Sequence, residues 1–78
     1  MQIKLNGEIH ELAETHTLED LVSELALTPQ RVAIELNQSV IRRDLWEQTI
    51  LNEGDRVEIV HFVGGGAYSS SKQKAVGS

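Results

Sequence analysis

The sequence contains no cysteine, a single proline and only three aromatic residues in 78 positions. Without cysteine, the chain can form no disulfide, no thiolate metal site and no persulfide of its own. No apolar run approaches the roughly twenty residues of a membrane helix, and the first residues lack the apolar stretch of a signal peptide. We therefore expect a cytoplasmic protein with one small domain and no contact with a membrane.

Basic residues are scarce in the first 66 positions, where five of them accompany twelve acidic residues and leave a net charge of −7. Proteins that bind nucleic acid draw most of their affinity from basic side chains that neutralise phosphates. The balance therefore argues against a nucleic-acid partner and favours a basic protein surface. On charge alone, an acidic surface that only keeps the chain soluble is an equally good explanation.

The usual signs of catalysis and of metal binding are missing. His10, His16 and His61 do not have the spacing of metal ligands, so we expect no metal and place these histidines at the surface. The glycine run at 64–66 is not followed by Lys-Ser/Thr, so it is not a phosphate-binding loop, and no Ser-His-Asp arrangement can be argued. We predict that the chain is not an enzyme and binds no cofactor.

Alternating apolar residues predict a hairpin at the start of the chain, around the turn Asn6-Gly7. A two-residue loop would set Lys4 opposite Ile9 and divide the apolar side chains between the two faces. A three-residue loop with a bulge pairs Ile3 with Ile9 and keeps one apolar face. We therefore predict the odd-length loop.

A helix is predicted to begin after Thr17, which can cap it, with Glu19 and Asp20 supplying negative charge to the first turn. Its apolar stripe predicts that it lies across a sheet. Pro29 prevents its continuation, so the helix should end near Leu25 or Ala26. The members of the stripe are Leu18, Leu21, Val22 and Leu25.

The second half of the chain predicts three further strands joined by short links. Strands are expected at 32–36, at 39–41 and, after the turn at 52–55, at 56–62; a helical turn or irregular segment is expected at 42–46 and a brief extended piece at 48–51. Apolar residues occupy both faces of 56–62, so this strand should be central and covered on more than one side. Trp46 and Phe62 are expected to pack in the core or at its edge.

The order of strand, strand, helix, strand, strand, short link and strand predicts an α+β fold of the β-grasp type, a mixed sheet crossed by one main helix. Together with the Asn6-Gly7 hairpin, the run from Ala33 to Asn37 and the closing block from Glu53 to Gly66, this order makes residues 1–66 resemble the ubiquitin-like sulfur carriers of thiamine biosynthesis, the ThiS family.

The resemblance implies that the chain is a substrate and that Gly66 is its reacting residue. In that family the terminal glycine carboxylate is adenylated by a partner enzyme that uses ATP and Mg²⁺, and is converted with a sulfur donor protein into a thiocarboxylate. Thiazole synthase then receives the sulfur. Gly64, Gly65 and Gly66 would extend about 10 Å at roughly 3.3–3.6 Å per residue into a narrow partner cleft. A flexible linker is the alternative meaning of three glycines.

Residues 67–78 follow the glycines and depart from the family pattern, because an amide at Gly66 cannot be adenylated. Their serine-rich and lysine-rich composition predicts a disordered tail. Three explanations remain open: a precursor extension that a protease removes after Gly66, a segment added for expression, or a natural addition that has abolished the carrier chemistry.

For partner docking we expect apolar and acidic residues near the glycines, namely Phe62, Val63, Glu58 and Glu53. Two other classes of function remain as alternatives. One is a noncatalytic β-grasp interaction module, and the other is an RNA-associated β-grasp domain, which the acidic charge disfavours. A carrier that delivers sulfur to molybdopterin, tRNA or a cysteine pathway is a closer alternative.

Overall fold

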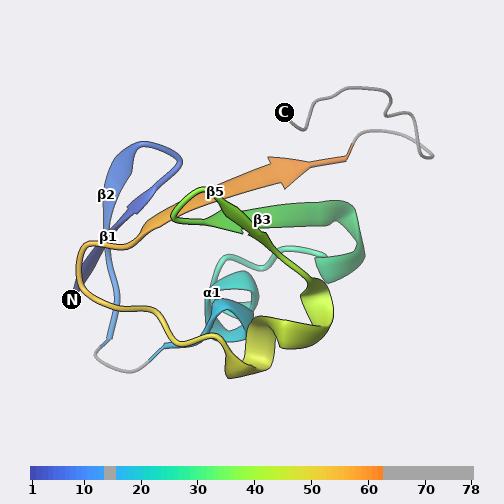
Figure 1. Ribbon diagram of the computed structural model, residues 1–78, viewed down its shortest axis with the longest axis horizontal. Coiled ribbons are helices and arrows are strands. Elements are labelled where there is room, and N and C mark those ends of the chain that lie inside the picture. The colour runs from blue at the N-terminus through green and yellow to red at the C-terminus, as the bar shows by residue number, and fades with distance from the viewer. Residues whose placement is uncertain (14–15, 63–78) are drawn as a thin grey trace.

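The computed structural model describes residues 1–13 and 16–62. Five strands form one mixed sheet in the order β2-β1-β5-β3-β4, with α1 and η2 on the same side of it (Figure 1). The elements are β1 (Gln2–Leu5), β2 (Glu8–Glu11), α1 (Leu18–Glu24), the 3-10 helix η1 (Pro29–Arg31), β3 (Val32–Leu36), β4 (Ser39–Ile41), the 3-10 helix η2 (Arg43–Gln48) and β5 (Arg56–His61). The predicted α+β fold with a mixed sheet and one main helix is confirmed.

The last strand, β5, lies in the middle of the sheet, as predicted. It runs parallel to β1 and antiparallel to β3, so the two ends of the described chain meet in neighbouring strands. The pairing with β1 covers only Arg56 and Val57, whereas the pairing with β3 continues to His61. The far end of β5 is therefore held from one side only by a neighbouring strand.

The predicted odd-length hairpin loop is wrong. Lys4 lies opposite Ile9 and Leu5 opposite Glu8, so the loop has two residues. Asn6 (φ 50°) and Gly7 (φ 86°) both adopt positive φ, as a type I′ turn requires. Ile9 consequently lies on the face away from α1 and is 60% exposed. The conformational preference of the Asn6-Gly7 turn sets the register, and not the grouping of apolar side chains on one face.

The helix begins and ends where the sequence predicts. The Asp20 N–H donates to Thr17 Oγ1 (3.1 Å), and the Thr17 N–H donates to Asp20 Oδ2 (3.0 Å), which together form a capping box. At the other end, Ala26 takes a left-handed conformation (φ 58°) directly after the C-cap Leu25. This reversal directs the chain back toward the sheet through η1.

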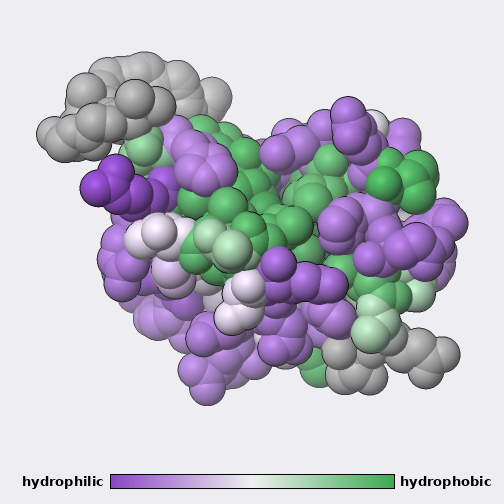
Figure 2. All heavy atoms as spheres, turned by 180° about the vertical axis from the view of Figure 1, so that it is seen from behind, coloured by the Kyte–Doolittle hydropathy of each residue, from purple (hydrophilic) through white to green (hydrophobic). Residues whose placement is uncertain are grey.

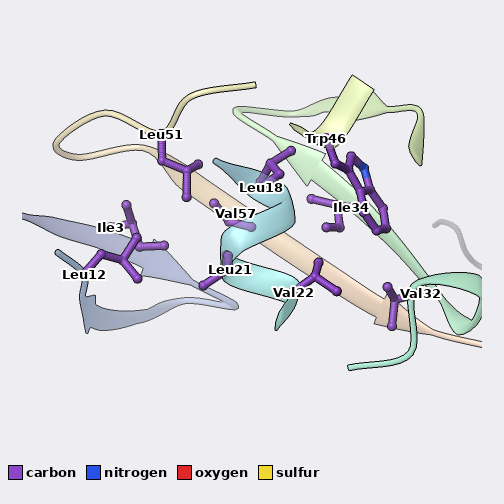
Figure 3. Packing of buried hydrophobic residues seen from close by; sticks show 10 residues of the cluster. All are labelled: Ile3, Leu12, Leu18, Leu21, Val22, Val32, Ile34, Trp46, Leu51 and Val57. Carbon is purple, nitrogen blue, oxygen red and sulfur yellow. The ribbon is translucent and has the colours of Figure 1, made fainter. Parts of the chain in front are cut away.

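The hydrophobic core lies between the sheet and α1, and η2 closes one side of it. Figure 3 shows side chains of β1, α1, β3, η2 and β5 converging in this layer. Trp46 is buried, as predicted, and its Nε1–H donates to the Ile41 carbonyl (2.9 Å). The ten buried residues are Ile3, Leu12, Leu18, Leu21, Val22, Val32, Ile34, Trp46, Leu51 and Val57.

Two predictions about β5 and the histidines need correction. Val57 is buried, but Val60 and Phe62 are 40% and 41% exposed, so β5 is not covered on both faces and Phe62 is not a core residue. His16 is not a surface residue either: its side chain is only 13% exposed, and its Nε2 lies 2.9 Å from Glu24 Oε1. Side-chain alternation in β5 explains the first result, because even-numbered residues point away from α1.

Candidate functional site at the end of β5

The predicted glycine lead follows β5 directly. Val63 and Gly64–Gly66 lie outside the described residues, as does the tail predicted for residues 67–78. The structure describes the chain as far as Phe62, and we call this residue the base of the glycine lead. The Phe62 N–H donates to the Arg31 carbonyl at 2.8 Å, so the backbone stays paired with the β3 side four residues before Gly66.

An apolar patch lies on the sheet face opposite α1, beside this base. We call it the open-face patch and define it as Ala33, Val40, Val60 and Phe62. Ala33 is paired with Val60 across β3 and β5, and Val40 on β4 lies opposite Glu35, the second residue after Ala33 on β3. Among the described residues, four of the six exposed large hydrophobic side chains lie on this face: Ile9, Val40, Val60 and Phe62. Exposed apolar side chains that cluster on one face are typical of a docking surface.

Apolar surface is also visible from outside the molecule. In the view from behind, hydrophobic atoms form a band across the middle of the molecule between polar margins (Figure 2). A surface with an apolar centre and a polar rim is the usual anatomy of a protein interface.

Two glutamates face each other next to the open-face patch. Glu35 on β3 lies directly opposite Glu58 on β5. The ion pairs found within the described residues are those of His16 with Glu24 and of Arg42 with Asp44, so neither glutamate is neutralised by one. Like charges at directly opposed positions destabilise a sheet. The pair therefore provides a place where a cationic side chain of a partner would relieve an existing repulsion.

The structure does not bring all the predicted docking residues together. Glu58 and Phe62 share the open face of β5 at alternate positions, as expected. Glu53 lies before the start of β5, where its Oε1 accepts a hydrogen bond from the Gln2 N–H (3.1 Å). Since about 20 Å of extended chain separates Arg56 from Phe62, Glu53 belongs to the opposite end of the strand.

Two asparagines hold β5 by its backbone, although the sequence indicated Asn6 only as a turn residue and Asn37 only as the end of a strand. The Asn6 N–H donates to the Val57 carbonyl (2.8 Å), and its Oδ1 accepts from the Ile59 N–H (2.7 Å). Asn37 holds Arg56 in the same way, with bonds of 2.8 Å and 3.0 Å. Both asparagines have positive φ. The Asn6-Gly7 turn can be recognised in the sequence. The hydrogen bond from the Ile59 N–H to Asn6 can be recognised only in the folded structure.

Among residues 1–13 and 16–62, no group of three or more His, Asp or Glu side chains is arranged to hold a metal ion. No helix in this part of the chain is long and apolar enough to cross a membrane. The cytoplasmic location stays a prediction.

A mixed five-stranded sheet with a central last strand, crossed on one face by one main helix, defines a β-grasp protein. The family model described as the ThiS family matches residues 3–66, and the chain belongs to that family. The crystal structure of the thiamine biosynthesis protein ThiS from Geobacter metallireducens superposes with a TM-score of 0.75 at 33% identity, covering 85% of this chain and all of that one.

Two curated relatives are similar to this chain in different ways. The sulfur carrier protein ThiS of Bacillus subtilis is 35% identical over 65 residues, which cover 82% of this chain and 98% of that protein. A thiazole synthase of Magnetococcus marinus is 43% identical over 68 residues, or 87% of this chain. The chain spans about a fifth of that enzyme's length, 21%.

Proposed function

We propose that this protein carries sulfur for the synthesis of the thiazole ring of thiamine, as a thiocarboxylate on Gly66. The observation that carries the proposal is the extent of the family match, which runs from β1 through β5 and ends at Gly66. The likeness to sulfur carriers over nearly their whole length supports it.

The proposed chemistry takes place on the main-chain carboxyl group and needs no catalytic side chain. A carboxylate oxygen of Gly66 attacks the α-phosphorus of ATP, pyrophosphate leaves, and an acyl-adenylate forms. Sulfur at the oxidation level of sulfide, supplied by a donor protein, then attacks the acyl carbon, and AMP leaves with the electrons of the C–O bond. The adenylating partner supplies the Mg²⁺ and the positive groups that stabilise the phosphate charge.

The chain's own residues have a binding role in this scheme. β5 presents the glycine lead, and Phe62 and Val60 provide apolar contact with the partner on the open face. Glu58, with Glu35, attracts a basic side chain at the rim of that contact. Val63 and Gly64–Gly66 enter the partner's cleft, where a side chain on any of the three glycines would add bulk at the point of closest approach.

Thiazole synthase is the proposed recipient of the sulfur. The support is that thiazole synthases of Magnetococcus marinus and Paramagnetospirillum magneticum each contain a segment similar to this chain. A sulfur carrier must meet the enzyme that receives its sulfur. Joining the two in one chain raises the effective concentration of the carrier segment near that enzyme. This observation favours thiazole synthesis over the molybdopterin, tRNA and cysteine pathways.

The Gly66–Ala67 bond must be hydrolysed before this chemistry can begin. Water adds to the Gly66 carbonyl carbon and the Ala67 amine leaves, which gives the free carboxylate. A chain that ends at Gly66 contains every residue of the family match, 3–66, and so has the same extent as the sulfur carrier of Bacillus subtilis, which is matched over 98% of its length.

Reconstitution tests the proposal. The chain ending at Gly66 is incubated with an adenylating enzyme of the same organism, Mg-ATP and a sulfur donor, and its intact mass is measured. We expect a gain that matches replacement of one oxygen by sulfur, and no gain for the 78-residue chain. A chain ending at Gly66 that releases no pyrophosphate and keeps its mass would contradict the proposal.

A further inference from the structure

β1 ends early in its pairing with β5, and β5 continues beyond it. β1 is paired with β5 only at Lys4–Arg56 and Leu5–Val57, because the hairpin then turns the chain away into β2. In a parallel ladder, the next N–H of β5 that points toward β1 is that of Ile59. β1 has already ended at this level, so none of its carbonyl groups can accept this hydrogen bond.

The side chain of Asn6 supplies the missing acceptor for the Ile59 N–H. Its backbone N–H makes the last main-chain bond from this side to β5, to the Val57 carbonyl, and its Oδ1 accepts the Ile59 N–H at 2.7 Å. A positive φ of 50° turns the backbone away, while the side chain continues along β5. The side-chain amide thus extends the β1 side of the ladder by one hydrogen bond.

We infer that Asn6 is a positioning residue for the carrier reaction: it holds the last part of β5 in the sheet, so that the chain leaves toward Gly66 from a fixed base. The inference rests on the proposed function. Beyond Ile59, the described β5 backbone is held only from the β3 side, through pairs such as Phe62 with Arg31. In the part of the chain that the structure describes, the Asn6–Ile59 bond lies one step beyond the last β1–β5 strand pair, Leu5–Val57, and steadies β5 from that side.

Loss of this hydrogen bond should leave the end of β5, before the glycines, less ordered. It should not change the chemistry at Gly66. An unpaired amide at Ile59 lets the end of β5 separate from the sheet more often. The adenylating enzyme must then order that segment on binding, which weakens binding without altering the acyl transfer. The KM for the carrier should rise and kcat should stay the same.

Asn37 offers a matched control within the same molecule. Its N–H and Oδ1 hold the Arg56 carbonyl and N–H at the start of β5, and it also has a positive φ of 51°. Asn37→Gly keeps the turn conformation and removes the bond to the Arg56 N–H, together with a second bond from Asn37 Nδ2 to Asp55 Oδ1 (3.1 Å), and it acts at the end of the strand remote from Gly66. Asn6→Gly keeps its turn and removes the bond to the Ile59 N–H near the exit, and Asn6→Asp keeps an acceptor in place.

The experiment compares these three variants with the parent chain. Amide hydrogen exchange in the 78-residue protein should show two amides exchanging about fivefold faster in Asn6→Gly and near the parent rate in Asn6→Asp: that of Ile59, and that of Phe62, which donates to the Arg31 carbonyl. With the chain ending at Gly66, Mg-ATP and the adenylating enzyme, Asn6→Gly should raise KM about fivefold with kcat within about twofold. Asn37→Gly should lower stability similarly and leave KM unchanged.

Two results would overturn the inference in different ways. If the parent chain is adenylated and Asn6→Gly has the parent KM, or shares a raised KM with Asn37→Gly, Asn6 has no positioning role and the proposed function stands. If the parent chain itself is not adenylated, the proposed function fails and the inference fails with it.

Discussion

The N–H of Phe62 lies 2.8 Å from the carbonyl oxygen of Arg31, which extends the pairing of β5 with the β3 side beyond the end of the strand. The same residue has a side chain that is 41% exposed on the open face. Its backbone is thus held in place while its side chain is partly exposed on the open face. This division of roles leads to the first prediction.

Phe62→Ala should weaken binding to the adenylating enzyme by about tenfold or more, because partly exposed aromatic residues near an interface centre contribute strongly to affinity. The free energy of unfolding should change by less than about 1 kcal/mol. Calorimetric titration and urea denaturation measure the two effects. Leu45→Ala is the control, since Leu45 is 44% exposed but lies on η2, away from the open face. Equal losses of affinity in both variants would remove Phe62 from the interface.

Glu58→Gln should stabilise the isolated protein and slow its association with a basic partner. Removing one of two opposed charges relieves a repulsion of about 0.2–1 kcal/mol. Loss of the charge also reduces electrostatic steering, so the association rate should fall and depend less on salt. Denaturant unfolding and stopped-flow binding report the two changes. Glu47→Gln on η2, which removes an exposed charge elsewhere, should do neither. A slower association in both variants would mean that only the total charge matters.

Trp46→Ala should destabilise the protein by about 3–5 kcal/mol, because a large buried side chain is lost and the Ile41 carbonyl loses its indole donor. Guanidinium unfolding followed by circular dichroism measures the change. Trp46→Phe keeps most of the apolar volume and should cost distinctly less. A loss below about 1 kcal/mol for the alanine variant would show that η2 does not close the core.

The sequence predicted those features that local chemistry determines. The helix limits follow from the cap at Thr17 and the stop before Pro29. β5 is central, as predicted, although the premise that both of its faces are covered was wrong. The hairpin register was mispredicted because it assumed that Ile9 had to join the core. The type I′ preference of Asn6-Gly7 outweighed the cost of exposing one isoleucine.

Other features depended on contacts between distant residues. The hydrogen bond from Ile59 to Asn6 joins positions 53 apart, and the opposition of Glu35 and Glu58 depends on the β3–β5 register. The low exposure of the His16 side chain, 13%, likewise depends on its neighbours in the fold. Of the candidate site, Glu58 and Phe62 could be placed together from strand alternation. Glu53 falls in the turn predicted at 52–55, so its distance from the glycines could also have been derived from the predicted strand that follows.

The most direct test of the account is the intact mass of the protein purified from the cells that naturally make it, while they synthesise thiamine. The account predicts a chain that ends at Gly66 and includes a fraction heavier by the difference between sulfur and oxygen. A population made up only of full-length, unmodified chains would contradict it.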